Sequence, residues 1–137
     1  MRYIVLDTNC LIQVLPSKSK YHKIWTDFLD GRYSLCVSNE ILMEYEEILS
    51  RLTSVEVARN VVEAIARHPM TCHSESYFRF RLLHDIDKDD DKFVDCAIAA
   101  NADYIVTEDS HFNTLQKIDF PSLCVLTLDE FLDVIEP

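Results

Sequence analysis

Carboxylates are the residues of this chain whose spacing is best suited to chemistry. Asp7 directly follows the apolar run Tyr3–Leu6, and Asp109 stands just beyond a second apolar run, Tyr104–Val106. Strands that pair in parallel end at the same edge of a sheet, so these two side chains are expected to lie close together. Residues 87–91 read Asp-Lys-Asp-Asp-Asp and come directly before a helical pattern of apolar residues. The spacing therefore predicts a pocket of negative charge at one edge of a parallel sheet.

A glutamate on a separate helix is a further candidate. Glu44 lies within the predicted helix Glu40–Arg51, with Ile41 three residues before it and Ile48 four residues after it. A solvated acidic face is the ordinary place for a helical glutamate. These apolar neighbours place Glu44 near the buried boundary of the helix instead. We therefore include it among the candidate site residues, together with Asp95, which lies one helical turn beyond the aspartate run.

Most of these acids also have a structural explanation. Asp7 can cap the turn that follows it, and Asp109 can cap a short helix that begins near His111. Asp90 and Asp91 can open a helix, where aspartate is favoured by capping and by the helix dipole. No single acid decides between structure and chemistry, so the prediction depends on their convergence.

Converging carboxylates need cations. Two carboxylates about 4 Å apart repel each other by about 4 kcal/mol at an effective dielectric constant of about 20. Carboxylate oxygens suit Mg²⁺ or Mn²⁺, and such ions also bind phosphates and activate water for hydrolysis. The only glycine in the chain is Gly31, which excludes the glycine-rich loops of nucleotide-binding proteins. The residues thus predict metal-assisted phosphodiester hydrolysis.

The overall charge limits how a nucleic acid could bind. The chain has 13 basic and 24 acidic residues, a formal net charge of −11, so general electrostatic attraction cannot hold a polyanion. A nucleic acid would need bound cations and a local basic patch, for which the candidates are Lys18, Lys20, Lys23, Arg79, Arg81, Lys88 and Lys92.

The five cysteines form no C-x-x-C pair. Cys36, Cys96 and Cys124 lie among apolar neighbours and are expected to be reduced and buried. They therefore give no sign of a zinc site or of a catalytic thiol.

Strand and helix patterns alternate along the 137 residues. This alternation predicts a single domain, residues 1–137, with a three-layer α/β/α fold and a mainly parallel sheet of about five strands. Asn39 is the expected cap of the helix that carries Glu44, and Thr53 is the expected start of a capping box for the next helix. The start of the chain, MRYIVLD, has too short an apolar run for a secretory signal, so a cytoplasmic location without membrane contact is expected.

Four motifs occur in one order along the chain. They are LDTN at Leu6–Asn9, S-x-x-I-L-x-E at Ser38–Glu44, D-x-D-D-D-x-F at Asp87–Phe93 and A-D-Y-I-V-T-x-D at Ala102–Asp109. Together they resemble the PIN domain family, in particular the branch described as toxin components of toxin–antitoxin systems. They span nearly the whole chain.

The resemblance implies a fold, a reaction and a site. The reaction is Mg²⁺- or Mn²⁺-dependent cleavage of single-stranded RNA that leaves a 5′-phosphate. An antitoxin partner and a homodimer are implied as well. The acidic quartet would be Asp7, Glu44, Asp90 and Asp109, with Asp91 as an alternative third ligand and with Asn9 and Thr107 as polar supports.

The sequence also leaves a second function open. The family commonly has glycine where this chain has Glu108, and the surface is strongly acidic. Both features suit a catalytically weak PIN-like module that regulates by binding another protein.

Overall fold

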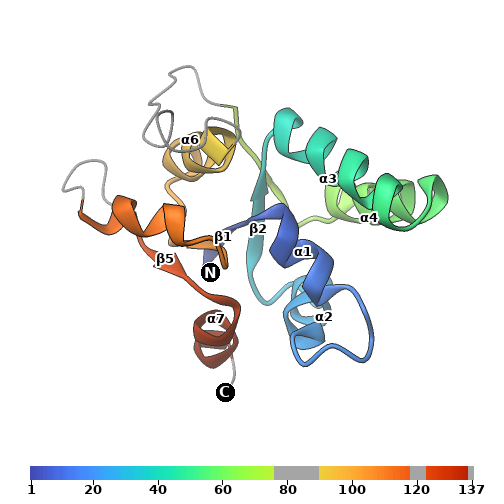
Figure 1. The fold of residues 1–137 in the computed structure, drawn as a ribbon, viewed down its shortest axis with the longest axis horizontal. Coiled ribbons are helices and arrows are strands. Elements are labelled where there is room, and N and C mark those ends of the chain that lie inside the picture. The colour runs from blue at the N-terminus through green and yellow to red at the C-terminus, as the bar shows by residue number, and fades with distance from the viewer. Residues whose placement is uncertain (76–89, 118–122, 136–137) are drawn as a thin grey trace.

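The structure is a computed structural model that describes residues 1–75, 90–117 and 123–135 (Figure 1). One sheet has the strand order β3-β2-β1-β4-β5, and every neighbouring pair is parallel. The strands are β1 (Tyr3–Leu6), β2 (Ser34–Val37), β3 (Cys72–His73), β4 (Tyr104–Val106) and β5 (Val125–Leu126). The predicted parallel sheet of about five strands is confirmed.

Helices cover both faces of this sheet. They are α1 (Thr8–Val14), α2 (His22–Leu29), α3 (Asn39–Leu52), α4 (Val55–Arg67), α6 (Asp91–Ala100), the 3₁₀ helix η2 (Ser110–Lys117) and α7 (Leu128–Ile135). Figure 1 shows α6 on one side of the sheet and α2 and α7 on the other. This arrangement confirms the expected three-layer α/β/α fold. Among the described residues, no helix has both the length and the apolar character needed to cross a membrane.

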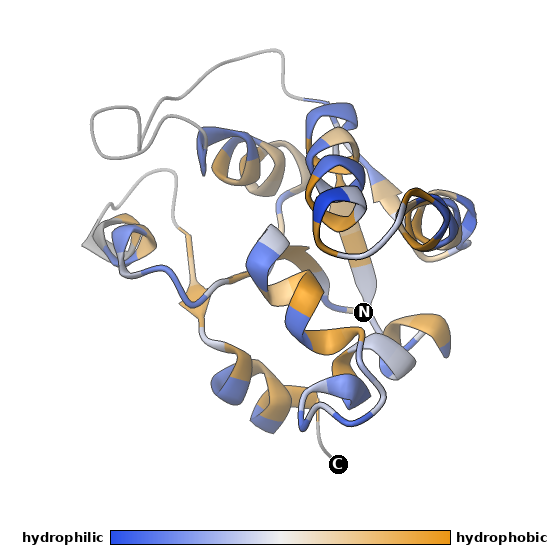
Figure 2. Ribbon diagram, turned by 45° about the vertical axis from the view of Figure 1, so that its right-hand side comes forward, coloured by the Kyte–Doolittle hydropathy of each residue, from blue (hydrophilic) through white to orange (hydrophobic). Residues whose placement is uncertain are grey.

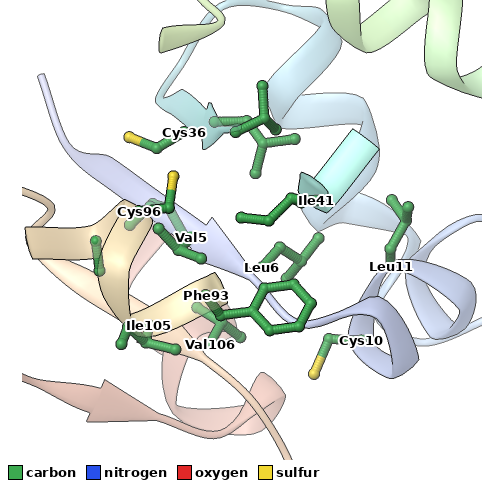
Figure 3. Close-up of a cluster of buried hydrophobic side chains, with 14 of the residues drawn as sticks. Val5, Leu6, Cys10, Leu11, Cys36, Ile41, Phe93, Cys96, Ile105 and Val106 are labelled. Atoms are coloured by element: carbon green, nitrogen blue, oxygen red, sulfur yellow. The ribbon is translucent and has the colours of Figure 1, made fainter. Parts of the chain in front are cut away.

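Strand β1 runs through the centre of the core. Its residues Ile4, Val5 and Leu6 are at most 2% exposed, as expected for a strand covered on both faces. In Figure 3 the ring of Phe93, from the first turn of α6, points toward the end of β1. Burying a side chain of this size stabilises the fold by about 2 kcal/mol, so α6 is held with its first turn near the end of β1.

In Figure 2 the helices carry hydrophobic residues along one side and hydrophilic residues along the other.

The register of β1 and β4 places two candidate site residues at the same level. Leu6 is paired with Val106, and the N–H of Asp7 donates to the carbonyl of Val106 over 3.0 Å. Asp7 and Thr107 therefore leave adjacent strands side by side. This backbone hydrogen bond fixes the first acid of the site relative to the last motif.

Two helix starts differ from expectation by one residue. Ser38, not Asn39, caps α3 by accepting from the N–H of Ile41. Ser54 caps α4 by accepting from the N–H of Val57, whereas the hydroxyl of Thr53 donates to the carbonyl of Leu49 at the end of α3. The expected capping box is wrong because Thr53 closes one helix and its neighbour opens the next.

Burial of the cysteines was predicted correctly for Cys36 and Cys96 but not for Cys124, which is exposed. Cys124 directly precedes the edge strand β5, and the side chains on either side of it, Leu123 and Val125, point into the core. Successive side chains of an extended segment face opposite sides, so Cys124 points outward.

Candidate active site

Asp7 lies at the carboxyl end of β1 and is 6% exposed. One oxygen, Oδ2, accepts a 2.7 Å hydrogen bond from the hydroxyl of Thr107. Asp7 occupies the N-cap position of α1 but makes no side-chain capping hydrogen bond. The capping explanation therefore does not account for this buried carboxylate.

Thr107 connects Asp7 to the last motif. Its hydroxyl oxygen accepts from the N–H of Asp109 at 3.0 Å, and its proton is donated to Asp7. Thr107 is 2% exposed, so both hydrogen bonds are shielded from water. This supporting residue holds two of the predicted acids in a fixed relation.

Glu44 is brought to the same edge by α3. The next residue, Tyr45, is fully buried and its hydroxyl donates to the carbonyl of Leu6, which attaches α3 to the end of β1. The two carboxylate oxygens of Glu44 have different partners. Oε2 accepts from the hydroxyl of Thr8, and Oε1 is 2.9 Å from the ammonium of Lys92. Glu44 thus lies in the site as one half of a partly buried ion pair.

Burial raises the pKa of Asp7 above its usual value. The charge of Glu44 raises it further, whereas the hydrogen bond from Thr107 opposes the rise. The backbone N–H groups of Asn9 and Thr8 also oppose it, although neither donates with capping geometry. The repulsion between Asp7 and Glu44 is the electrostatic effect expected of converging acids.

Asp90, Asp109 and His111 form a second group. Each offers one ligand atom, and these atoms lie within 4.8 Å of one another. Asp90 stands at the N-cap of α6 but does not cap it with its side chain. Asp109 accepts from the N–H of His111 at 2.9 Å, so it also has the capping role that was its structural alternative.

The remaining candidates differ in position. Asn9 lines an open hollow of about 490 Å³ together with Asp7 and Asp109. Asp91 and Asp95 are buried in α6 and are not members of the ligand group found among the described residues. Of the two alternatives for the third acid, only Asp90 is a member of that group.

Three lysines of the proposed basic patch are already paired with carboxylates. Lys20 lies 3.0 Å from Asp129 and Lys23 lies 2.8 Å from Asp27, so both form ion pairs. Lys92 is paired with Glu44, as described above. The candidates Arg79, Arg81 and Lys88 lie outside the described residues.

Glu108, the departure from the family pattern, has a structural partner. Its carboxylate accepts from the N–H of Leu128, the first residue of α7, at 2.8 Å. A helix start leaves such N–H groups without intrahelical partners. Glu108, at the position where the family commonly has glycine, therefore provides an acceptor for the first N–H of α7.

The acids fit a divalent cation. Two carboxylates and an imidazole converge within 4.8 Å, and Asp7 shares a hollow with one of those carboxylates. Oxygen-rich groups of this kind bind hard divalent ions, and a cation would offset the repulsion that raises the pKa of Asp7. The donor set is therefore compatible with the metal that the resemblance implies.

Sequence reasoning did not assign roles to three neighbours of these acids. The hydroxyl of Thr8 holds Glu44, Lys92 was considered only as a contact for RNA, and His111 was considered only as part of a helix. The signal available for His111 was its position two residues after Asp109 on a turn.

The fold is that of a three-layer α/β/α protein with a parallel sheet and acidic side chains at the carboxyl ends of its strands. Two solved structures have a similar fold. A VapBC2 structure from Rickettsia felis, bound to a DNA fragment from its promoter, aligns with a TM-score of 0.64 at 17% identity and covers 91% of this chain and 98% of that chain. A DNA-bound VapBC structure from Salmonella typhimurium aligns with a TM-score of 0.62 at 18% identity and covers 93% and 99%. At these identities the similarity concerns the fold. No curated protein matches the chain.

The family follows from the sequence itself. The family model described as PIN domain matches residues 3–111, which include β1, the helix with Glu44, the start of α6 and the turn with Asp109 and His111. This chain belongs to the PIN domain family.

Proposed function

We propose that this protein is a Mg²⁺- or Mn²⁺-dependent endonuclease that hydrolyses phosphodiester bonds of single-stranded RNA. The observation that carries the proposal is that Glu44 is held by the hydroxyl of Thr8, the residue next to Asp7, while Asp109 lines the same hollow as Asp7 beyond the carboxyl ends of β1 and β4. Repulsion between acids at this edge destabilises the metal-free protein, which supports a role for them beyond folding.

Each acid has a role in this proposal. Asp90 and Asp109 would hold the cation, with Asp7 beside them, and Thr107 fixes the orientation of Asp7. A divalent cation supplies a Lewis acid that lowers the pKa of water and offsets charge on the phosphate. Glu44, which Thr8 and Lys92 hold, would orient the attacking water or accept its proton. Attack on phosphorus breaks the bond to the 3′ oxygen and leaves a 5′-phosphate.

An assay with two variants tests this function. Unstructured RNA is incubated with Mg²⁺ or Mn²⁺ and with wild type, Asp7→Asn or Asp133→Asn, the last being a control because Asp133 is exposed on α7. We expect Asp7→Asn to lower the cleavage rate at least about 100-fold and Asp133→Asn to leave it unchanged. Equal cleavage by the wild type and Asp7→Asn would contradict the site.

The alternative is a PIN module that binds partners and cleaves weakly. The ammonium of Lys92 on Glu44 favours it, because it places a competing positive charge in the site. Glu108 no longer supports this alternative, because it caps α7. Calorimetric titration with Mn²⁺ separates the two functions, since a regulatory module without metal chemistry would release no binding heat.

We also propose that the protein is the toxin of a toxin–antitoxin pair and forms a homodimer. The two similar structures are VapBC assemblies bound to DNA, and the motifs resemble the toxin branch of the family. Co-expression with the product of the neighbouring reading frame, followed by mass measurement in solution, tests both parts. A monomer that neither binds that product nor is inhibited by it would contradict them.

A further inference from the structure

The turn after β4 brings an imidazole to the two carboxylates of the second group. Nδ1 of His111 lies 3.4 Å from Oδ1 of Asp109, and Asp90 completes the group within 4.8 Å. Around one octahedral ion with bonds of about 2.1 Å, neighbouring ligand atoms stand about 3 Å apart and opposite ones about 4 Å apart. Small side-chain movements would therefore let all three residues bind one cation.

The backbone prepares this arrangement. The N–H of His111 donates to Oδ1 of Asp109, and the N–H of Asp109 donates to the hydroxyl of Thr107. The carboxylate is thereby fixed on the same side as the imidazole. Hydrogen bonds that orient metal ligands in this way are a usual part of metal sites.

We propose that His111 is a nitrogen ligand of the site's cation and that it makes the site prefer a first-row transition-metal ion over Mg²⁺. The inference rests on the proposed function, which needs a divalent cation at these acids. An all-carboxylate site suits Mg²⁺, whereas imidazole is a poor ligand for Mg²⁺ and a good one for ions such as Co²⁺ and Ni²⁺. One histidine among oxygen ligands therefore changes which metal is bound, not only how tightly.

A purely structural His111 would behave differently. If His111 only contacted Asp109 at this half-exposed turn, it would support the turn without distinguishing one divalent ion from another. The ratio of affinities for two metals, measured on the protein without RNA, separates the two roles.

The test uses Co²⁺ and Mg²⁺ as probes and four proteins: wild type, His111→Gln, Asp90→Asn and His73→Gln. Co²⁺ binding is followed by its visible absorption, and Mg²⁺ affinity by competition. We expect His111→Gln to weaken Co²⁺ at least about tenfold and Mg²⁺ less than about threefold, with a changed Co²⁺ spectrum. Asp90→Asn should weaken both metals. His73, which is exposed on β3 and outside the group, provides the control and should change neither.

Each outcome supports or contradicts the role of His111 as a ligand. An unchanged Co²⁺:Mg²⁺ affinity ratio in His111→Gln contradicts that role. If Asp90→Asn nevertheless loses both metals, the cation site itself is still supported. A loss of Co²⁺ in His73→Gln equal to that in His111→Gln places Co²⁺ on surface histidines and also overturns it. A wild-type protein that binds neither metal contradicts both this inference and the metal dependence in the proposed function.

Discussion

A single hydroxyl, that of Thr107, joins the two strands of the site. It accepts from the N–H of Asp109 and must therefore direct its proton toward Asp7. A hydrogen bond to a buried carboxylate is strong and directional, so it selects one orientation of Asp7. The consequence is a carboxylate that is held in place before any cation or substrate arrives.

The first prediction concerns the charge on Asp7. Burial, followed by the charge of Glu44, raises its pKa in the folded protein above 3.8, so the ionised form is disfavoured by folding. This destabilisation is absent below pH 3.8. It grows as the pH rises toward the pKa of Asp7 in the folded protein, and it is complete above that pKa. Asp7→Asn should therefore raise the melting temperature of metal-free protein by about 3 °C at pH 7.

The pH dependence is the control for that prediction. The gain from Asp7→Asn should shrink as the pH falls toward 3.8, whereas Asp133→Asn, on the exposed face of α7, should change little at any pH. Thermal unfolding between pH 4 and pH 8 measures both. A lower melting temperature at pH 7 would mean that Asp7 stabilises the fold, as a capping residue does.

A second prediction concerns Lys92. Its ammonium is 2.9 Å from Glu44 and the pair is partly buried, so it compensates negative charge in the metal-free site. Lys92→Met should destabilise metal-free protein by about 1 kcal/mol and should increase the rise in melting temperature caused by Mn²⁺. Lys92→Arg keeps the charge and should behave like wild type. If Lys92→Met proved more stable without metal, the compensating role would be wrong.

The sequence could indicate which acids are candidates for a site, but not which hydrogen bonds and ion pairs their carboxylates form. Asp7 and Asp109 follow apolar strands, and this position alone predicted their edge of the sheet. The ion pair of Lys92 with Glu44 joins residues 48 positions apart, and no local pattern contains such a contact. For the same reason no local pattern distinguishes Asp90 from Asp91 as the third acid.

At the level of elements, the site depends on how α3 is attached to β1. The hydroxyl of Tyr45 donates to the carbonyl of Leu6, one residue before Asp7, while the adjacent Glu44 reaches into the site. A fully buried hydroxyl that meets a backbone carbonyl is both a stabilising contact and a positional constraint.

A third prediction tests that attachment with a matched pair of variants. Tyr45→Phe leaves a buried carbonyl without this donor and should lower the free energy of unfolding by about 1–2 kcal/mol. Tyr33→Phe removes a comparable 2.7 Å hydrogen bond to Ile24, away from the acids, and should lower it similarly. Only Tyr45→Phe should also reduce RNA cleavage. Urea unfolding and the cleavage assay measure the two effects, and equal loss of activity in both variants would contradict a positional role.

Elements were predictable where one physical signal dominates. The parallel pairing of the strands was expected from the alternation of apolar strands and helices, whereas the order β3-β2-β1-β4-β5 needed the structure. The single glycine, Gly31, has a positive φ of 76°, which is typical of a residue just after a helix. Helix starts were less certain, because Ser38 and Asn39 are both good caps and only the backbone conformation selects Ser38. Helix α1 was not predicted, since its first residues, Thr8 and Asn9, are polar and read as a turn.

For the whole molecule, contact with water decides which groups can carry charge, and this applies both to the many acidic residues and to the buried cysteines. A net charge of −11 is tolerable because most of it lies in water, whereas ionising a buried group has no such compensation. The buried thiols should therefore stay neutral and unreactive while the fold is intact. Cys10, Cys36 and Cys96 are all buried within the core of this sheet (Figure 3).

The fourth prediction is the order in which the five thiols react. Burial raises the pKa of Cys96 to about 12 and those of Cys10 and Cys36 further, so their thiolate forms are negligible at pH 8.5. The exposed Cys124 should be alkylated first and the half-buried Cys72 more slowly, although the pKa of Cys124 is raised as well. Mass spectrometry after timed labelling gives the order, with urea-unfolded protein as the control in which all five react. Rapid labelling of Cys96 in folded protein would mean that α6 opens readily, and with it the acidic site that its first turn helps to form.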